Sequence, residues 1–200
     1  VVATPFIQPT FASKYSLSSL TGLSYAPLSG GGITIINTDA QLTAGMGSVT
    51  QDDGGVLISI PFTFTYDGVA YNQITMSTNG WIAAGNFSTI DAVSSRAAGN
   101  LFTGTVPNQT MAAWFKDMGA NFPLGTGSLR HGLTGADVYT FQWDNAVGSG
   151  FSDGSTNLIS FQVSIYGPAS IAPGRIEYLY GPQVNTLATA ASIGIENSTG

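Results

Sequence analysis

Val56–Ala84 reads VLISIPFTFTYDGVAYNQITMSTNGWIAA, and this stretch decides the fold class. Apolar side chains occupy every second position from Val56 to Tyr66, which is the period of a β-strand with one buried face. Asp67-Gly68 follows at once, and this pair favours a two-residue hairpin turn because both of its residues tolerate a positive φ. Asn79-Gly80 marks a second turn. The stretch therefore predicts an antiparallel meander with tight turns at both pairs.

The same alternation recurs in the rest of the chain. Pro61 cannot donate to a sheet ladder, so we expect an edge, a bend or a bulge at that position. Ile90–Gly99, with Asp91 as its candidate N-cap, is the one stretch that favours a short helix. Further strands are predicted at Thr110–Lys116, Asp137–Asp144, Asn157–Tyr166, Arg175–Tyr180 and Ala191–Glu196.

This density of short strands and turns predicts an all-β fold, namely a two-sheet antiparallel β-sandwich that is jelly-roll-like or Ig-like. A chain of 200 residues is long enough for one such domain. The buried faces of the strands then meet between the two sheets. We expect this core to contain Phe62, Phe64, Phe141, Trp143, Phe161 and Val163.

The first fourteen residues differ from the rest of the chain. Pro5 and Pro9 hold their backbone extended. We therefore predict an extended N-terminal arm at residues 1–14 and a single sandwich domain at residues 15–200. Such an arm either adds a strand to an open sheet edge of another copy or packs on its own domain as a first strand, and the sequence leaves both open. The apolar side chains that would make the contact are Val1, Val2, Phe6, Ile7 and Phe11.

Composition narrows the function classes. Charged residues make up 8% of the chain, and the net charge of −6 argues against a nucleic-acid partner, which would need clustered basic groups. No apolar run approaches the roughly 20 residues of a membrane-spanning helix, so we expect no membrane insertion. The chain has no cysteine, which excludes thiol chemistry and cysteine-based metal sites.

The body of the chain also resembles a known family. Tyr15–Gly85 carries YSLSSLTGLSYAPLSGGG and then DDGGVLISIPFTFTYDGVAYNQITMSTNGWIAAG. Further matching stretches follow in the same order: MAAWFKDM at Met111–Met118, VYTFQWDN at Val138–Asn145, FQVSIYG at Phe161–Gly167, IEYLYG at Ile176–Gly181 and ASIGIE at Ala191–Glu196. These stretches resemble the N-terminal β-sandwich domain of secreted Bacteroidetes-type surface proteins that carry a type IX secretion sorting signal. The resemblance implies a β-sandwich that is secreted or displayed at the cell surface, and it supplies no catalytic residues.

Catalytic chemistry has weak support in the sequence. His131 is the only histidine, so no Ser–His–acid triad can be singled out and a zinc site lacks ligands. We expect His131 to be structural or at the surface. Asp117, Asp144 and Glu177 lie near strands that could be neighbours, as a glycosidase pair requires, but none of them sits in an acid–base motif. We therefore expect no enzyme activity, no catalytic residue and no cofactor.

Acidic loops and tryptophans each allow two interpretations. Asp52-Asp53-Gly54-Gly55 is the most calcium-like loop, with Asp144 and Asp153 as other candidate acids. A plain turn is the favoured interpretation of this loop, and we expect no bound metal.

The three tryptophans also allow two interpretations. Exposed tryptophans would bind glycan rings, whereas the alternating strands in which these residues lie favour packing in the core. The tryptophans concerned are Trp81, Trp114 and Trp143, and Asn-x-Ser/Thr sequons at Asn86, Asn108 and Asn197 are expected to be coincidental.

The favoured function is an extracellular structural or adhesive surface module. The apolar arm suggests that copies assemble into a homo-oligomer or a homopolymeric fibre. One alternative is a glycan-binding accessory module of a secreted protein, with surface glycans as partners. A second alternative is a secreted hydrolase.

Overall fold

The computed structural model describes residues 15–42, 52–87, 108–120, 127–147, 157–184 and 191–198. Their elements are β1 (Ile33–Ile36), the 3-10 turn η1 (Asp39–Gln41), β2 (Gly55–Tyr66), β3 (Val69–Ser77), β4 (Trp81–Ala84), β5 (Thr110–Phe115), β6 (Ser128–Gly135), β7 (Val138–Val147), β8 (Leu158–Tyr166), β9 (Ile176–Val184) and β10 (Ser192–Ile195). The predicted helix Ile90–Gly99 and the arm residues Val1, Val2, Phe6, Ile7 and Phe11 lie outside the described residues.

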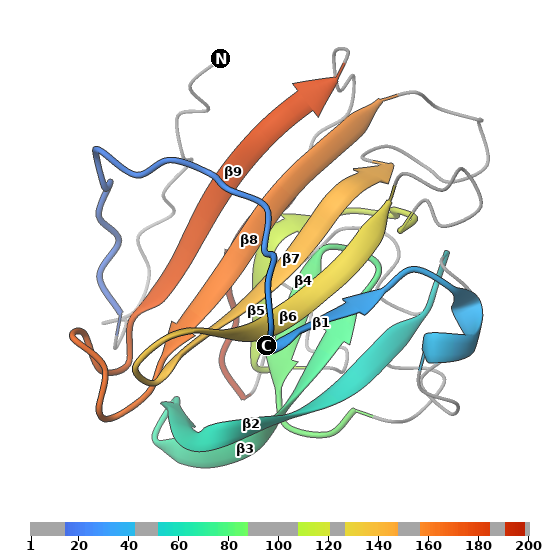
Figure 1. Cartoon of the computed structure of the whole chain (residues 1–200). Helices are drawn as coiled ribbons and strands as arrows, with labels where there is room; N and C mark the ends of the chain where they lie inside the picture. Colours follow the sequence, from blue (N-terminus) through green and yellow to red (C-terminus); the bar gives the residue numbers. More distant parts are fainter. Residues whose placement is uncertain are drawn as a thin grey trace.

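The strands form two antiparallel sheets of five strands each, which confirms the predicted β-sandwich (Figure 1). Sheet A has the order β1-β6-β7-β8-β9, and sheet B has the order β10-β5-β4-β3-β2. Among the described residues, no helical segment has the length and apolar character needed to cross a lipid bilayer.

The predicted meander is β2, β3 and β4 of sheet B. Asp67 and Gly68 both have positive φ, at 50° and 83°, as the predicted two-residue hairpin turn requires. The second turn is wider than predicted, because Thr78–Gly80 connects the strands and only Gly80 has a positive φ, of 80°. A Cβ at Gly80 would lie 1.9 Å from the carbonyl oxygen of Trp114, so only glycine fits there.

Strand β2 shows why the alternation predicted it well. Its even-numbered residues from Ile58 to Tyr66 are buried, and its exposed positions are Ser, Pro and Thr. The pairing register with β3 shifts between Ser59 and Phe64, around Pro61. Strand β2 also lies at the edge of sheet B, so Pro61 is found at an edge and at an irregularity, as expected.

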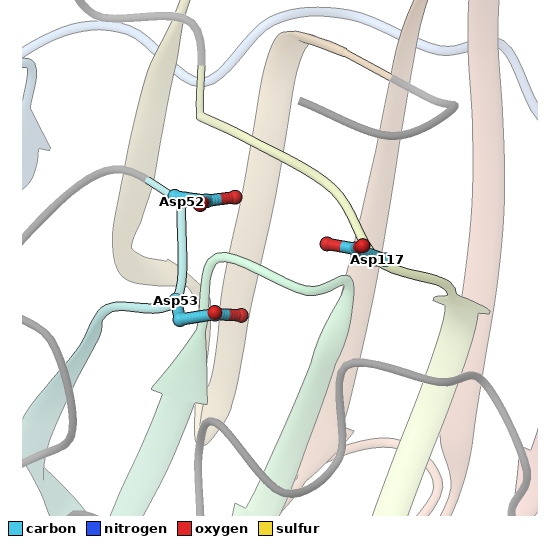
Figure 2. Close-up of side chains that lie close together, drawn as sticks. All are labelled: Asp52, Asp53 and Asp117. Atoms are coloured by element: carbon cyan, nitrogen blue, oxygen red, sulfur yellow. The ribbon is translucent and has the colours of Figure 1, made fainter. Parts of the chain in front are cut away.

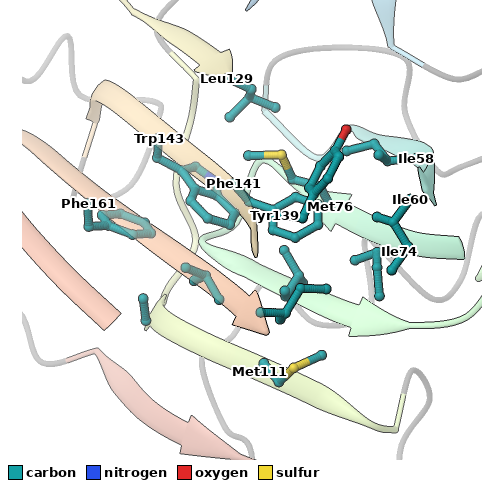
Figure 3. Close-up of a cluster of buried hydrophobic side chains, with 14 of the residues drawn as sticks. Ile58, Ile60, Ile74, Met76, Met111, Leu129, Tyr139, Phe141, Trp143 and Phe161 are labelled. Carbon is teal, nitrogen blue, oxygen red and sulfur yellow. The ribbon is translucent and has the colours of Figure 1, made fainter. Parts of the chain in front are cut away.

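The core lies between the sheets, where side chains of β7 and β8 face those of β2, β3 and β5 (Figure 3). Trp143 stacks on Phe161 with ring centroids 4.8 Å apart, and its Nε1 donates to the carbonyl of Ser77 in the opposite sheet at 2.9 Å. Trp81 is also fully buried, whereas Trp114 is partly buried. The six residues expected in the core are all buried: Phe62, Phe64, Phe141, Trp143, Phe161 and Val163.

Two tyrosines of β9 close one side of the sandwich. The Tyr178 hydroxyl donates to the carbonyl of Gly194 in β10 at 2.8 Å, and the Tyr180 hydroxyl donates to the carbonyl of Ala113 in β5 at 2.7 Å. Both bonds run from sheet A to sheet B. They hold the two sheets together where β9 and β10 each form an edge.

Strands β1 and β6 were not predicted. The sequence of β6 places Arg130 on one face and His131 on the other, so neither face is continuously apolar. Strand β1, at Ile33–Ile36, has only four residues and no alternation. Both form because they pair with a neighbour: β1 with β6, and β6 with the strongly alternating β7.

Candidate functional site

The loop Thr78–Gly80 organises one end of the sandwich. The Thr78 hydroxyl accepts a hydrogen bond from the Gly54 amide at 3.0 Å. The Asn79 side chain is fully buried, its Nδ2 donates to Asp53 Oδ1 at 2.9 Å, and its Oδ1 accepts from the Met118 amide at 2.8 Å. One short loop therefore fixes the chain before β2 and the chain after β5 next to each other.

This arrangement brings three carboxylates together. One carboxylate oxygen from each of Asp52, Asp53 and Asp117 lies within 4.8 Å of the others (Figure 2). Burial raises the pKa of Asp52, and the charges of Asp53 and Asp117 raise it further. Burial and Asp53 also raise the pKa of Asp117, while Lys116 opposes the shift. Burial first, and the neighbouring charges second, therefore disfavour the ionised forms of Asp52 and Asp117.

The cluster extends the acidic loop that the sequence singled out. Carboxylates are the ligands that calcium prefers, but calcium takes about six to eight oxygens and the cluster supplies three acidic side chains. Asp117 was missed as a member, because the sequence grouped it with the glycosidase candidates. Asp144 lies elsewhere, and Asp153 is outside the described residues. The expectation that no metal is bound stays a prediction.

His131 is a buried side chain of β6. Its Nδ1 is 2.8 Å from the Tyr139 hydroxyl, and the two rings stack with centroids 6.0 Å apart. Burial lowers the pKa of His131 to about 4, so the ring is neutral at physiological pH. His131 is therefore buried and hydrogen-bonded within sheet A, and its expected structural role stays a prediction.

The glycosidase candidates do not form a group. Asp144 pairs with Arg130 on the outer face of sheet A at 2.7 Å. Glu177 pairs with Arg175 and accepts a hydrogen bond from the Tyr166 hydroxyl at 3.1 Å. Asp117 belongs to the acidic cluster at the end of the sandwich. Each of the three acids thus has its own partners in a different place.

A segment before β1 covers the outer face of sheet A. Residues Tyr25–Leu28, here called the strap, run across this face from β9 towards β1 (Figure 1). The Tyr25 ring lies over Gly181 of β9, where a Cβ would be 2.6 Å from ring atoms. The strap could not be predicted from the sequence, because its residues have no apolar periodicity.

Side chains of three neighbouring strands bind the main chain of the strap. The Leu28 amide donates to Gln142 Oε1 of β7 at 2.7 Å, and Arg130 Nη1 of β6 donates to the Leu28 carbonyl at 2.8 Å. Gln162 Nε2 of β8 donates to the Ala26 carbonyl at 2.8 Å. Arg130, Gln142 and Gln162 are paired in register across the sheet, so they form one row.

The outer face below the strap is polar and yet buried. The side chains of Gln142, Ser160, Gln162 and Asp144 are all buried there. Burial raises the pKa of Tyr25 to about 12, and the charge of Asp144 contributes. These alternating polar positions would normally face solvent, and it is the strap that removes them from it.

A family model described as NIDO related matches residues 14–200. The chain belongs to the NIDO-related family. NIDO-related domains are typically extracellular, which agrees with the extracellular β-sandwich implied by the sequence resemblance. No curated protein and no solved structure matches this NIDO-related chain.

Proposed function

We propose that this NIDO-related domain is a non-catalytic structural or adhesive module of a secreted or cell-surface protein. In this proposal copies associate through the N-terminal part of the chain, into an oligomer or a homopolymeric fibre. The sequence resemblance supports a parent protein of the Bacteroidetes type that is exported by type IX secretion.

The observation that carries the proposal is a set of exposed leucines next to the arm. Leu17, Leu20 and Leu23 are 76%, 48% and 49% exposed. They lie between the arm at residues 1–14 and the strap. All three fall within one short segment of the sequence, where a second copy could bury them together, and the low charge of this chain does not oppose association.

The surroundings of the titratable groups support the non-catalytic part of the proposal. In the described part of the chain, His131 is bonded to Tyr139, and Asp144 and Glu177 are paired with arginines. Each group has a partner that stabilises the fold. A hydrolase would need such groups to converge on one open site.

The test compares the oligomeric state of four proteins by sedimentation velocity and negative-stain microscopy. The parent should form oligomers or fibres as its concentration rises. Deletion of residues 1–11 should leave a folded chain that associates much less than the parent, because the five apolar arm residues are lost from the contact. The triple variant Leu17→Ser, Leu20→Ser, Leu23→Ser should weaken association, and the triple variant Ser16→Ala, Ser18→Ala, Ser19→Ala is its matched control. A parent that stays monomeric at every concentration would contradict the proposal.

A further inference from the structure

We propose that the outer face of sheet A is a binding site for an extended peptide segment, and that its partner is the strap Tyr25–Leu28 of a second copy of this chain. The strap then exchanges between copies instead of closing on its own domain. This inference deepens the proposed self-association, since it names a segment that crosses and the surface that receives it.

The bonds that hold the strap do not depend on which copy supplies it. Gln142 and Arg130 bind the amide and the carbonyl of Leu28, and Gln162 binds the carbonyl of Ala26. These bonds join side chains of sheet A to main-chain atoms of the strap. A second copy offers the same main-chain atoms, so every contact made within one chain can be made between two.

The face can open without exposing the core. The residues below the strap are amides, hydroxyls and the Arg130–Asp144 ion pair, all of which water can solvate. Leu28 is the buried apolar side chain of the strap. Gln142 Nε2 is buried and has no hydrogen-bond partner among the described residues, so in this part of the chain the closed state also leaves one donor of this face unused. Release of the strap therefore costs little compared with opening the sandwich.

Glycines next to the strap supply a hinge. Gly30 and Gly32, between the strap and β1, have φ values of +99° and +89°, and a Cβ at Gly30, Gly31 or Gly32 would meet no atom within 4 Å. Gly22, before the strap, has a φ of +78° and equally open surroundings. Glycine tolerates these and other backbone conformations, so the strap can leave its own domain while β1 stays paired with β6.

Exchange of the strap would also carry the arm to the neighbour. Residues 1–24 precede the strap in the chain, and so the three exposed leucines and the arm move with it. Reciprocal exchange closes a dimer, whereas exchange in one direction around successive copies gives an open chain. Both products fit the proposed self-association.

Engineered cysteines test the exchange directly, because the chain has no cysteine of its own. One tagged full-length chain carries Tyr25→Cys, and a second chain with a different tag carries Gly181→Cys, since the Tyr25 ring lies over Gly181. After the two chains are mixed and oxidised, we expect a disulfide-linked heterodimer at roughly ten times the yield of a control pair. The control combines Gly181→Cys with Ile171→Cys, which is 93% exposed in a loop. A yield no higher than that of the control would overturn the exchange.

Two further full-length variants keep the test decisive if a single cysteine weakens the fold. The double variant Tyr25→Cys, Gly181→Cys should lock the strap in its own domain under oxidising conditions and prevent exchange, and reduction should restore it. Oligomers that persist unchanged in the locked chain would overturn strap exchange while leaving association through the arm intact.

Deletion of Gly31 shortens the hinge and should raise the dimer fraction seen by native mass spectrometry. An unchanged dimer fraction would also contradict the inference.

Discussion

His131 links one residue to the stability of the whole fold. Its pKa is lowered to about 4 by burial, below the usual value of about 6.5. Between these two pKa values the unfolded chain binds a proton on His131 and the folded chain does not. The contribution of His131 to the free energy of unfolding is therefore complete above about pH 6.5 and is lost as the pH falls towards 4. We expect a loss on the order of 3 kcal/mol by pH 4.

The variant His131→Phe isolates this effect, since the chain has no other histidine. Urea unfolding at several pH values should show that the parent loses stability between pH 6.5 and 4.5 and that His131→Phe does not. The variant also loses the hydrogen bond to Tyr139, which changes its stability relative to the parent by the same amount at every pH. The comparison therefore uses the pH dependence and not the stability at pH 7. Equal slopes for the two proteins would mean that His131 titrates normally in the folded state.

The acidic cluster gives the opposite pH dependence. Because the pKa of Asp52 is raised in the folded state, the folded chain binds this proton more readily than the unfolded chain does. Burial of the ionised Asp52 carboxylate, together with repulsion from its neighbours, therefore lowers stability above about pH 4, and this cost vanishes at lower pH. Asp52→Asn should raise the melting temperature at pH 7 and leave it unchanged at pH 3.

The control for this substitution is Asp39→Asn, which lies in η1 and outside the cluster, and should change the melting temperature little. Chelation by EDTA should leave the parent unchanged. If Asp52→Asn instead lowers the melting temperature at pH 7 and EDTA has the same effect on the parent, the cluster binds a cation and the expectation of no metal is wrong.

Among the elements, β8 carries the most informative core residue. Phe161 is fully buried and stacks on Trp143 of β7. Phe161→Ala should lower the free energy of unfolding by about 3–5 kcal/mol, because it removes a large apolar side chain and leaves a cavity. Urea unfolding checks the value, with Thr63→Ala on the exposed face of β2 as a control expected within about 0.5 kcal/mol of the parent. Parent-like unfolding of Phe161→Ala would contradict the packing between the sheets.

Elements with one apolar and one polar face could be predicted from the sequence. The alternation of β2 and β8 identifies the buried faces, and Asp67-Gly68 fixes the turn between β2 and β3. Strand β6 could not be predicted, because its place in the sheet depends on pairing with β7 and not on its own pattern. Local sequence determines an element only where its own side chains supply the burial.

The β-sandwich could be predicted from the sequence, whereas the strap on the outer face of sheet A could not. The strap is held by hydrogen bonds to Gln142 and Gln162, which in the sequence are ordinary polar residues of alternating strands. Asp117 likewise joins Asp52 and Asp53 because the buried side chain of Asn79 binds both Asp53 and the Met118 amide. Both features depend on contacts between segments that are distant in the chain, and no local spacing encodes them.

The path of the strap has a consequence for the order in which the molecule folds. Leu28 and Gln142 are 114 positions apart, and Ala26 and Gln162 are 136 positions apart. Contacts of such long range form late, since the loops between them must close first. The strap is therefore made early in synthesis and docks only after β7 and β8 have assembled. During that delay the outer face of sheet A is uncovered and the strap is undocked. A neighbouring copy can then place its own strap on this face, or bind the free strap to its own sheet. If the strap exchanges, the local concentration of this chain during folding decides the product. A low concentration favours a strap docked on its own domain, and a high concentration favours a strap docked on another copy.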